Sequence, residues 1–369
     1  MSSYIVNRNT KNALSLHLQS NYITFYVNFN FFHAAYSYSI YNLLSTFSAF
    51  HAKLIHMDTL NFRYNHLNEY FKSLFGERTL KICIDGGFSC PNRDGTCGTS
   101  GCIFCGEHGS GENMKNNTKE SISKQVTDYF KTYRAERANK FIVYFQNFSN
   151  TYDTLENLKA KYDAALIDER IVALAVATRP DCINEDIVKL LKSYEIEKNY
   201  KVFVELGFQT SNDETGKLIN RGYTSETFFK AVQLLAQYEI ETIAHVMVGL
   251  PNESQDDVLN TIKFLNKTPI KGIKIHSTYI IKNTKLEEMY LNNQYTPLTL
   301  EEYIDTAVLV IGHLRKDIIV HRISGDAPKD MLVAPEWNLH KKWIINGIEK
   351  ALVEKDIWQG KFLVSTATQ

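Results

Sequence analysis

Short apolar runs alternate with helical patterns along most of this chain, and this alternation restricts the folds open to it. Residues 121–134, 185–193 and 255–265 carry apolar side chains at three- and four-residue steps, as a half-buried helix does. Repeated strand and helix units of this kind build a parallel sheet with helices packed against it. The sequence therefore predicts an α/β fold, an incomplete (β/α)6 TIM-like barrel. Its strands are expected at residues 81–84, 141–145, 171–177, 202–206, 243–248 and 273–275.

Length and charge alone exclude few functions. A chain of 369 residues can bury one large core or two smaller ones. It carries 41 Lys and Arg residues against 41 Asp and Glu residues, so it has no overall field that would attract a polyanion. If a nucleic acid binds, a local basic patch must hold it.

The first 57 residues differ from the rest of the chain. They contain no Asp or Glu, and residues 21–50 contain no Lys or Arg either. A membrane span needs about 20 mainly apolar residues. Asparagines, serines and His33 interrupt this stretch, so no stable membrane association is expected. We predict that residues 1–57 are an atypical extension, disordered or produced by an upstream start, with Met57 as the functional start; a membrane or surface anchor is the alternative.

The cysteines carry the strongest chemical signal. Five of the six lie between Cys83 and Cys105 among several glycines, which suits a reducing compartment rather than a disulfide framework. We therefore expect a cytoplasmic protein. Soft thiolates grouped in a reduced protein are metal ligands before they are anything else. Cys83, within the first strand, is interpreted as a small buried hydrophobe.

Three of these thiols fit one iron–sulfur cluster. Cys102 and Cys105 lie about one helical turn apart, and Cys90 can return to them through a loop that contains several glycines. A cubane 4Fe-4S cluster has one iron more than three thiolates can bind, which leaves that iron open to a small molecule. Cys90, Cys102 and Cys105 are therefore the predicted metal ligands and the centre of the predicted catalytic site.

The residues around these thiols resemble a known family. Residues 81–105, KICIDGGFSCPNRDGTCGTSGCIFC, resemble the cluster loop of radical S-adenosylmethionine (SAM) enzymes, and in particular a bacterial family allied to the Elongator catalytic subunit. The resemblance runs from about residue 63 to the C-terminus. The common spacing in the superfamily is Cys-x3-Cys-x2-Cys, so the longer first gap here is a departure that matches this branch.

The resemblance implies a reaction, two cofactors and a division into domains. A 4Fe-4S cluster on the three cysteines would reductively split SAM into methionine and a 5'-deoxyadenosyl radical, which takes a hydrogen atom from an unknown substrate. An electron donor such as flavodoxin or ferredoxin is implied. The implied domains are a radical SAM core barrel at residues 58–280 and a C-terminal α+β extension at residues 281–369 that covers the barrel mouth.

The resemblance also assigns residues to the adenine and the amino group of SAM. Phe104 would contact the adenine beside the last cluster ligand, and Gly249 would let the backbone approach the ring. Gln146 and Asn150 follow the second strand, where the family has a Gly-Gly-Glu segment that holds the amino group. That triad is absent here. The competing interpretation of Phe104 is a core aromatic that closes the loop.

Further assignments concern the ribose and methionine parts of SAM. The run ELGFQT at residues 205–210 resembles a family element in which Glu205 and Gln209 would face these groups. Arg179 could grip the methionine carboxylate as a fork. The alternative is that Arg179 pairs with Glu205 to neutralise buried charge. His245, within its strand, is open between a core histidine and a site group.

Two other functions remain open from the sequence. One is a non-catalytic iron–sulfur or zinc protein in which Cys97 supplies a fourth ligand; in the radical SAM interpretation Cys97 is a spare thiol. The other is a tRNA-modifying or RNA-binding protein of the Elongator-like branch. The expected substrate is accordingly a small molecule or a tRNA.

Overall fold

The computed structural model describes residues 14–19, 22–27, 62–107, 109 and 120–363, and the chain divides into two units after residue 61. In the first unit, strands β1 (Leu14–Gln19) and β2 (Tyr22–Val27) pair in the antiparallel direction. The rest of the predicted extension at residues 1–57, and the predicted start at Met57, lie outside the described residues. Within the described ranges, no helix is both long enough and apolar enough to cross a membrane.

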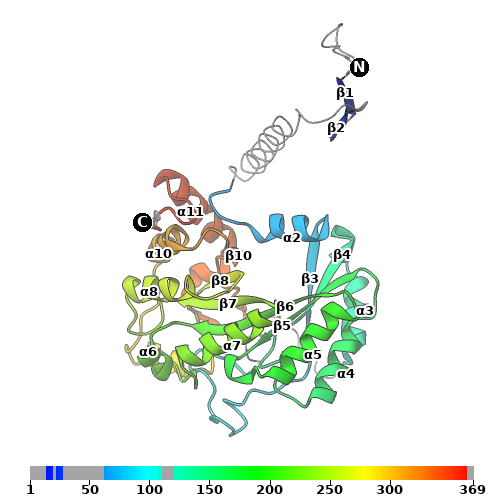
Figure 1. Cartoon of the computed structure of the whole chain (residues 1–369). Coiled ribbons are helices and arrows are strands. Elements are labelled where there is room, and N and C mark those ends of the chain that lie inside the picture. Colours follow the sequence, from blue (N-terminus) through cyan, green and yellow to red (C-terminus); the bar gives the residue numbers. More distant parts are fainter. Residues whose placement is uncertain (1–13, 20–21, 28–61, 108, 110–119, 364–369) are drawn as a thin grey trace. The chain divides into compact units, whose positions relative to one another are not determined.

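The second unit is built on a parallel sheet in the strand order β10-β8-β7-β6-β5-β4-β3 (Figure 1). The six strands expected from the sequence are all present and slightly longer than predicted, and the incomplete parallel barrel is confirmed. They are β3 (Thr79–Ile84), β4 (Lys140–Phe145), β5 (Ile171–Thr178), β6 (Lys201–Gln209), β7 (Glu241–Val248) and β8 (Gly272–Ser277).

One edge of this sheet was missed by the sequence analysis. β10 (Ile319–Arg322) pairs in parallel with β8 and adds a seventh strand to the sheet of the described second unit. Its four residues, IVHR, are too short and too polar a run for apolar periodicity to identify. The strand comes from beyond residue 280, where the core barrel was predicted to end.

Helices cover the outer face of the sheet (Figure 1). Each begins after a Ser, Thr or Asn whose side chain accepts a hydrogen bond from the amide of the third helical residue, which satisfies an otherwise unpaired donor. Their apolar sides bury outward side chains of the strands, such as Val143, Val204 and Val246. The helices are α3 (Ile122–Phe130), α4 (Leu155–Ala165), α5 (Glu185–Ile196), α7 (Ser225–Gln237), α8 (Gln255–Leu265) and α10 (Leu300–His313).

Helix α2 (Leu67–Phe75) packs instead on the inner face of the sheet. Its buried Phe71 lies 5.9 Å from Phe203 and 6.3 Å from His321, measured between ring centroids. The helix contacts both edge strands, β3 and β10. The hydroxyl of Tyr70 donates to Glu241, the first residue of β7. α2 therefore spans the open side of the incomplete barrel at the amino ends of the strands and leaves the carboxyl ends accessible.

Shorter elements complete the described chain. β9 (Ile280–Ile281) pairs antiparallel with β11 (Leu332–Ala334), and α11 (Lys341–Glu354) packs against α10. The predicted boundaries at 58–280 and 281–369 stay predictions. The remaining elements are α6 (Asp213–Leu218), α9 (Lys285–Leu291) and the 3-10 helices η1 (Ala135–Arg137), η2 (Pro180–Cys182) and η3 (Glu336–Leu339).

Candidate functional site

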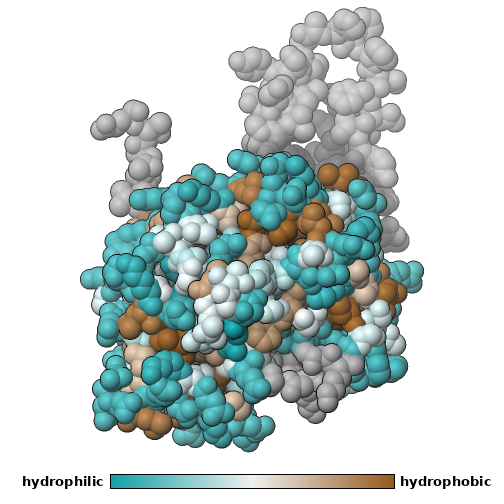
Figure 2. Space-filling model, turned by 90° about the horizontal axis from the view of Figure 1, so that it is seen from below, coloured by the Kyte–Doolittle hydropathy of each residue, from teal (hydrophilic) through white to brown (hydrophobic). Residues whose placement is uncertain are grey.

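A cavity of about 1080 Å³ lies on the inner side of the sheet. Strands β3, β4, β6, β7, β8 and β10 contribute to its lining, together with loops that follow them. Figure 2 views the molecule from the side on which the loop after β3 lies; this face is largely hydrophilic, with hydrophobic side chains in separate small areas. Small-molecule pockets usually measure roughly 300–1,000 Å³, so the cavity is large enough for more than one small ligand.

The three predicted cluster ligands lie on one loop, residues 90–105, between β3 and α3. The loop is folded by its own backbone: the amide of Cys97 donates to the carbonyl of Pro91, and the amide of Cys105 donates to the carbonyl of Cys102. The side chains of Cys90, Cys102 and Cys105 are half-buried, and Cys97 is exposed. Cys105 also lines the cavity. The loop therefore brings thiols to the carboxyl ends of the strands.

One side chain of this loop attaches it to the barrel, and its neighbour joins the two ends of the loop. The amide of Asn92 donates to the carbonyl of Asn220 at 2.6 Å and lies 3.8 Å from the sulfur of Cys102. The guanidinium of Arg93 donates to the carbonyl of Cys105 at 2.8 Å. Burial raises the pKa of the Cys102 thiol to about 11, so the thiolate is favoured only when a cation binds it.

These thiols have the donor chemistry of an iron–sulfur cluster. In a cubane cluster each thiolate binds a different iron, so its protein ligands remain apart. Thiolate-only donor sets also favour iron–sulfur clusters over hard cations. The residues present fit a 4Fe-4S cluster.

A buried polar network occupies the wall of the cavity nearer to α2. The carboxylate of Glu205 is fully buried and accepts from the ammonium of Lys81 at 2.7 Å and the hydroxyl of Tyr144 at 2.6 Å. It also lies 2.7 Å from Nε2 of His245 and forms an ion pair with Lys274. The four partners of Glu205 all line the cavity. One carboxylate thus serves two ammonium groups.

The charges of this network are unevenly matched. Burial would raise the pKa of Glu205, but the ammonium groups of Lys274 and Lys81 outweigh it and hold that pKa well below its usual range. Burial, together with Lys81 and Arg322, lowers the pKa of Lys274 to about 7. Burial and Lys274 lower the pKa of His245 to about 4. At neutral pH the carboxylate is therefore ionised and the imidazole is neutral.

Lys81, Tyr144 and Lys274 were not predicted as site residues. A parallel strand covered on both faces usually has an almost continuous apolar sequence. A lysine inside β3 and another inside β8 break that pattern, and this break could have indicated that both lysines belong to a site. Cys83 was interpreted as a buried hydrophobe, which is wrong: it alternates with Ile82, lines the cavity and is exposed. His245, which was left open, is a member of the network.

The family follows from comparison with known proteins. The radical SAM superfamily model matches residues 93–265, and the radical SAM C-terminal domain model matches residues 270–354. Uncharacterized protein YtqA of Bacillus subtilis is 34% identical over 300 residues, which cover 81% of this chain and 92% of YtqA. The chain belongs to the radical SAM superfamily. Proteins of the radical SAM superfamily bind a 4Fe-4S cluster and SAM.

Two further matches connect this radical SAM chain with the Elongator branch. The tRNA uridine(34) acetyltransferase of Methanocaldococcus jannaschii is 31% identical over 170 residues, which cover 45% of this chain and 30% of that protein. The solved structure of Methanocaldococcus infernus Elp3 has a TM-score of 0.57 at 19% identity and covers 76% of this chain and 64% of that chain. At that identity the likeness shows the fold. The expected kinship with the Elongator catalytic subunit is confirmed.

The radical SAM cavity includes some of the residues assigned to SAM. Phe104, Gln146 and Gln209 line it together with Cys105. Gln209 sits at an irregularity where β6 pairs with β7, with a φ of 61°, and its side-chain oxygen accepts from the hydroxyl of Tyr223 at 3.0 Å. An aromatic ring and two amide side chains therefore face the same space as the last cysteine of the loop.

Two other assigned residues lie outside the lining of the cavity. Asn150 is fully buried, and its amide donates to the carbonyl of Ala177 at 2.7 Å, which ties the loop after β4 to the end of β5. Gly249 has a φ of +86°, and a Cβ atom there would come within 2.9 Å of Leu298. The close approach that this glycine allows is therefore to a side chain of the same protein.

Arg179 pairs with Asp181 rather than with Glu205. Its guanidinium forms a fork on the Asp181 carboxylate, with distances of 2.9 and 2.6 Å, and donates to the carbonyl of Arg221 at 2.9 Å. The alternative of an ion pair with Glu205 is wrong, because the sheet presents that carboxylate to the lysines on the inner face. Arg179 lies against the ring of Tyr223, 4.8 Å from its centroid.

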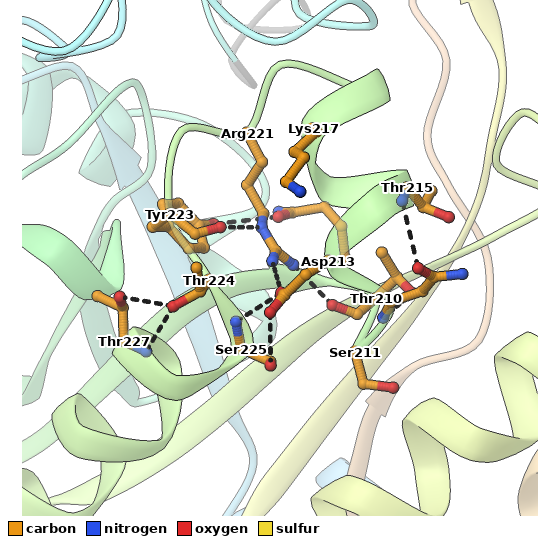
Figure 3. Close-up of polar contacts among 12 residues, drawn as sticks. Thr210, Ser211, Asp213, Thr215, Lys217, Arg221, Tyr223, Thr224, Ser225 and Thr227 are labelled. Carbon is orange, nitrogen blue, oxygen red and sulfur yellow. Dashed lines mark hydrogen bonds and ion pairs between the residues drawn. The ribbon is translucent and has the colours of Figure 1, made fainter.

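Arg221 fastens the loop that follows β6 (Figure 3). Its fully buried guanidinium donates to the carbonyls of Phe208 and Thr210 and forms an ion pair with Asp213 at 2.9 Å. Asp213 in turn accepts from the amide and the hydroxyl of Ser225, at the start of α7. These contacts hold the end of β6, and hence its terminal glutamine, beside the cavity.

Proposed function

We propose that this chain is a radical SAM enzyme that binds one 4Fe-4S cluster through Cys90, Cys102 and Cys105. The observation that carries the proposal is the backbone-folded loop after β3, which carries these three thiols and places Cys105 in the lining of the cavity. When bound, such a cluster supplies the single electron that splits SAM into methionine and a 5'-deoxyadenosyl radical, which removes a hydrogen atom from the substrate.

The side chains of the loop and the lining would bind and orient the cofactors. The amide of Asn92 points a donor at the sulfur of Cys102, and hydrogen bonds to cluster sulfurs tune the reduction potential. Phe104 offers an aromatic face to the adenine, and Gln146 and Gln209 offer amides to the polar parts of SAM. The walls of the cavity would shield the radical from water.

The other assigned residues would act on SAM through the loops that they hold. Asn150 joins the ends of β4 and β5, and Arg179 joins the end of β5 to the segment after α6. Glu205 fixes the lysines of the inner wall, and Gly249 lets Leu298 pack closely. These are positioning roles rather than direct contacts with the cofactor.

We also propose the partners and the compartment of the reaction. The substrate would occupy the cavity between the sheet and the C-terminal segment. A soluble one-electron donor such as flavodoxin or ferredoxin would reduce the cluster in the cytoplasm, under low oxygen.

Anaerobic reconstitution tests the proposal. Reconstituted protein is expected to hold about four iron atoms per chain, to give the electron paramagnetic resonance signal of a reduced cluster, and to form 5'-deoxyadenosine when SAM and dithionite are added. Protein that takes up no iron, or that holds the cluster and still forms no 5'-deoxyadenosine, would contradict it.

A tRNA is the second candidate for the substrate, because the radical SAM region is similar to that of a tRNA uridine(34) acetyltransferase. Nucleoside analysis of tRNA from a deletion strain tests this candidate. Loss of one modified nucleoside, restored by the wild-type gene, would support it, and an unchanged nucleoside profile would exclude it.

A further inference from the structure

The lining of the cavity is basic, although the chain as a whole is neutral. Its lining residues, all of them described, include one Asp and six Lys or Arg. With the buried Glu205 added, cations outnumber carboxylates six to two. Asp326 is paired with Arg322 and Lys341, and Glu205 is paired with Lys81 and Lys274. Among these described residues, no further carboxylate balances the remaining two cations. The six cations are Lys81, Arg134, Lys274, Arg322, Lys329 and Lys341.

The same lining contains buried polar atoms that have no hydrogen-bond partner within the described part of the chain. They are His276 Nε2, His321 Nδ1, Ser324 Oγ and Asn338 Nδ2. The other amide atom of Asn338, Oδ1, accepts from the hydroxyl of Ser277 at 2.6 Å, which leaves Nδ2 as a donor. Each of these groups can donate a hydrogen bond. Leaving a buried polar group unpaired is unfavourable, so a ligand with several acceptors would be favoured here.

These groups come together on one wall of the cavity, formed by β8, β10 and the segment at 323–341. Lys274 and Arg322 are register partners on the neighbouring strands β8 and β10. The hydroxyl of Ser277, at the end of β8, accepts from the amide of Gly325 at 3.3 Å, which holds the turn after β10 against that strand. Each of these two cations already pairs with one carboxylate, Lys274 with Glu205 and Arg322 with Asp326. A bound anion would add a further acceptor beside both.

We propose that this wall binds the carboxylate or phosphate group of a small anionic substrate. The inference rests on the proposed function and adds the chemical class of the substrate. A guanidinium and an ammonium with several uncharged donors around them suit an oxyanion. Lys274 is buried and Arg322 is half-buried in the cavity. Cations enclosed in this way favour a small molecule over the backbone of a nucleic acid.

Isothermal titration of the anaerobically reconstituted protein tests the proposal. Succinate and inorganic phosphate are the probes, at constant ionic strength, and the neutral succinamide is the matched control compound. At least one of the two anions is expected to bind, and succinamide is not. Arg322→Gln should weaken that binding by about tenfold or more, because a hydrogen bond to a charged group contributes about 1.5–3 kcal/mol. Absence of anion binding, or equal binding of succinamide, would overturn the proposal.

Variants separate the anion site from the rest of the molecule. Ser324→Ala removes one donor without removing a charge and is expected to weaken binding several-fold. Lys230→Gln, on the exposed face of α7, should leave binding unchanged. Iron content is measured on every variant. If Arg322→Gln keeps both its iron and the wild-type anion affinity, the anion site is overturned while the cluster assignment stands.

The same experiment tests two competing ligands, SAM and tRNA. SAM carries a carboxylate of its own, so the titrations are repeated with saturating SAM. An anion response that persists supports a separate substrate site, and one that SAM abolishes overturns it. A gel shift with bulk tRNA tests the second competing ligand. If the wild-type protein binds tRNA but neither succinate nor phosphate, and Arg322→Gln abolishes the tRNA binding, the proposal is overturned in favour of an RNA ligand.

Discussion

The thiol loop at residues 90–105 and the polar network around Glu205 contribute to the same cavity but are built in different ways. The loop is one continuous segment that its own backbone hydrogen bonds fold. The network takes one side chain from each of β3, β4, β6, β7 and β8. Local contacts can therefore establish the first region, whereas the second exists only when the whole sheet is in register. The two regions should respond differently to substitution.

The largest expected effect falls on the loop. Replacing Cys90, Cys102 or Cys105 with Ser removes one ligand and should abolish cluster binding, measured as iron per chain after anaerobic reconstitution. The matched control is Cys97→Ser, at an exposed thiol of the same loop, which should keep wild-type iron. Loss of iron in the control would instead favour a site with four thiolates. Without the cluster, the free energy of unfolding of each Ser variant should differ from that of the wild type by less than about 1 kcal/mol.

The network should show the opposite pattern. Glu205→Gln leaves the half-buried ammonium group of Lys81 and the buried one of Lys274 without their counterion, so the free energy of unfolding should fall by about 3–5 kcal/mol. Urea unfolding followed by circular dichroism measures this change. Glu226→Gln, at an exposed position of α7, is the control and should change stability by less than about 0.5 kcal/mol. A change below about 1 kcal/mol at Glu205 would show that the network does not stabilise the fold.

Acid should weaken the network through its histidine. The pKa of His245 is lowered to about 4, below its ordinary 6.5, so the unfolded state binds the proton first as pH falls. Stability should therefore decrease between pH 6.5 and pH 4. Between pH 7 and pH 5 this histidine should lower the free energy of unfolding by about 2 kcal/mol.

His245→Gln keeps a donor for Glu205 and should reduce the acid-induced loss, as measured by urea unfolding at both pH values. His276 and His321, whose pKa values are also lowered by burial, should continue to contribute to it. An identical pH dependence in wild type and variant would contradict the assignment to His245.

The smallest effect is expected where the loop meets the barrel. Asn92→Ala removes the hydrogen bond to the carbonyl of Asn220 and should cost about 1 kcal/mol in unfolding free energy. It also removes the donor near the Cys102 sulfur, so the reduction potential of the reconstituted cluster should shift. Asn260→Ala, exposed on α8, should change neither quantity. An unshifted potential in Asn92→Ala would show that this amide does not act on the cluster.

Sequence alone determined the features of this protein that depend on residues close together along the chain. Apolar runs predicted the strands from β3 to β8, because a strand covered on both faces is mostly apolar. The spacing of Cys90, Cys102 and Cys105 predicted that the three thiols bind one cluster, because a short loop brings its own thiols together. The resemblance to radical SAM enzymes assigned Gln209 and Phe104 to SAM, and both residues line the cavity.

The tertiary structure decided which distant side chains meet. Arg179 pairs with Asp181 two residues away because Glu205 faces the inner wall, and that orientation follows from the register of β6. The pairing of β10 with β8 places Arg322 beside Lys274, and the packing of α2 closes the open side of the barrel. The fold thereby gathers an excess of cations in one cavity, although the chain as a whole is neutral. Composition cannot report this, because it records how many charges a chain carries and not which of them the fold makes neighbours.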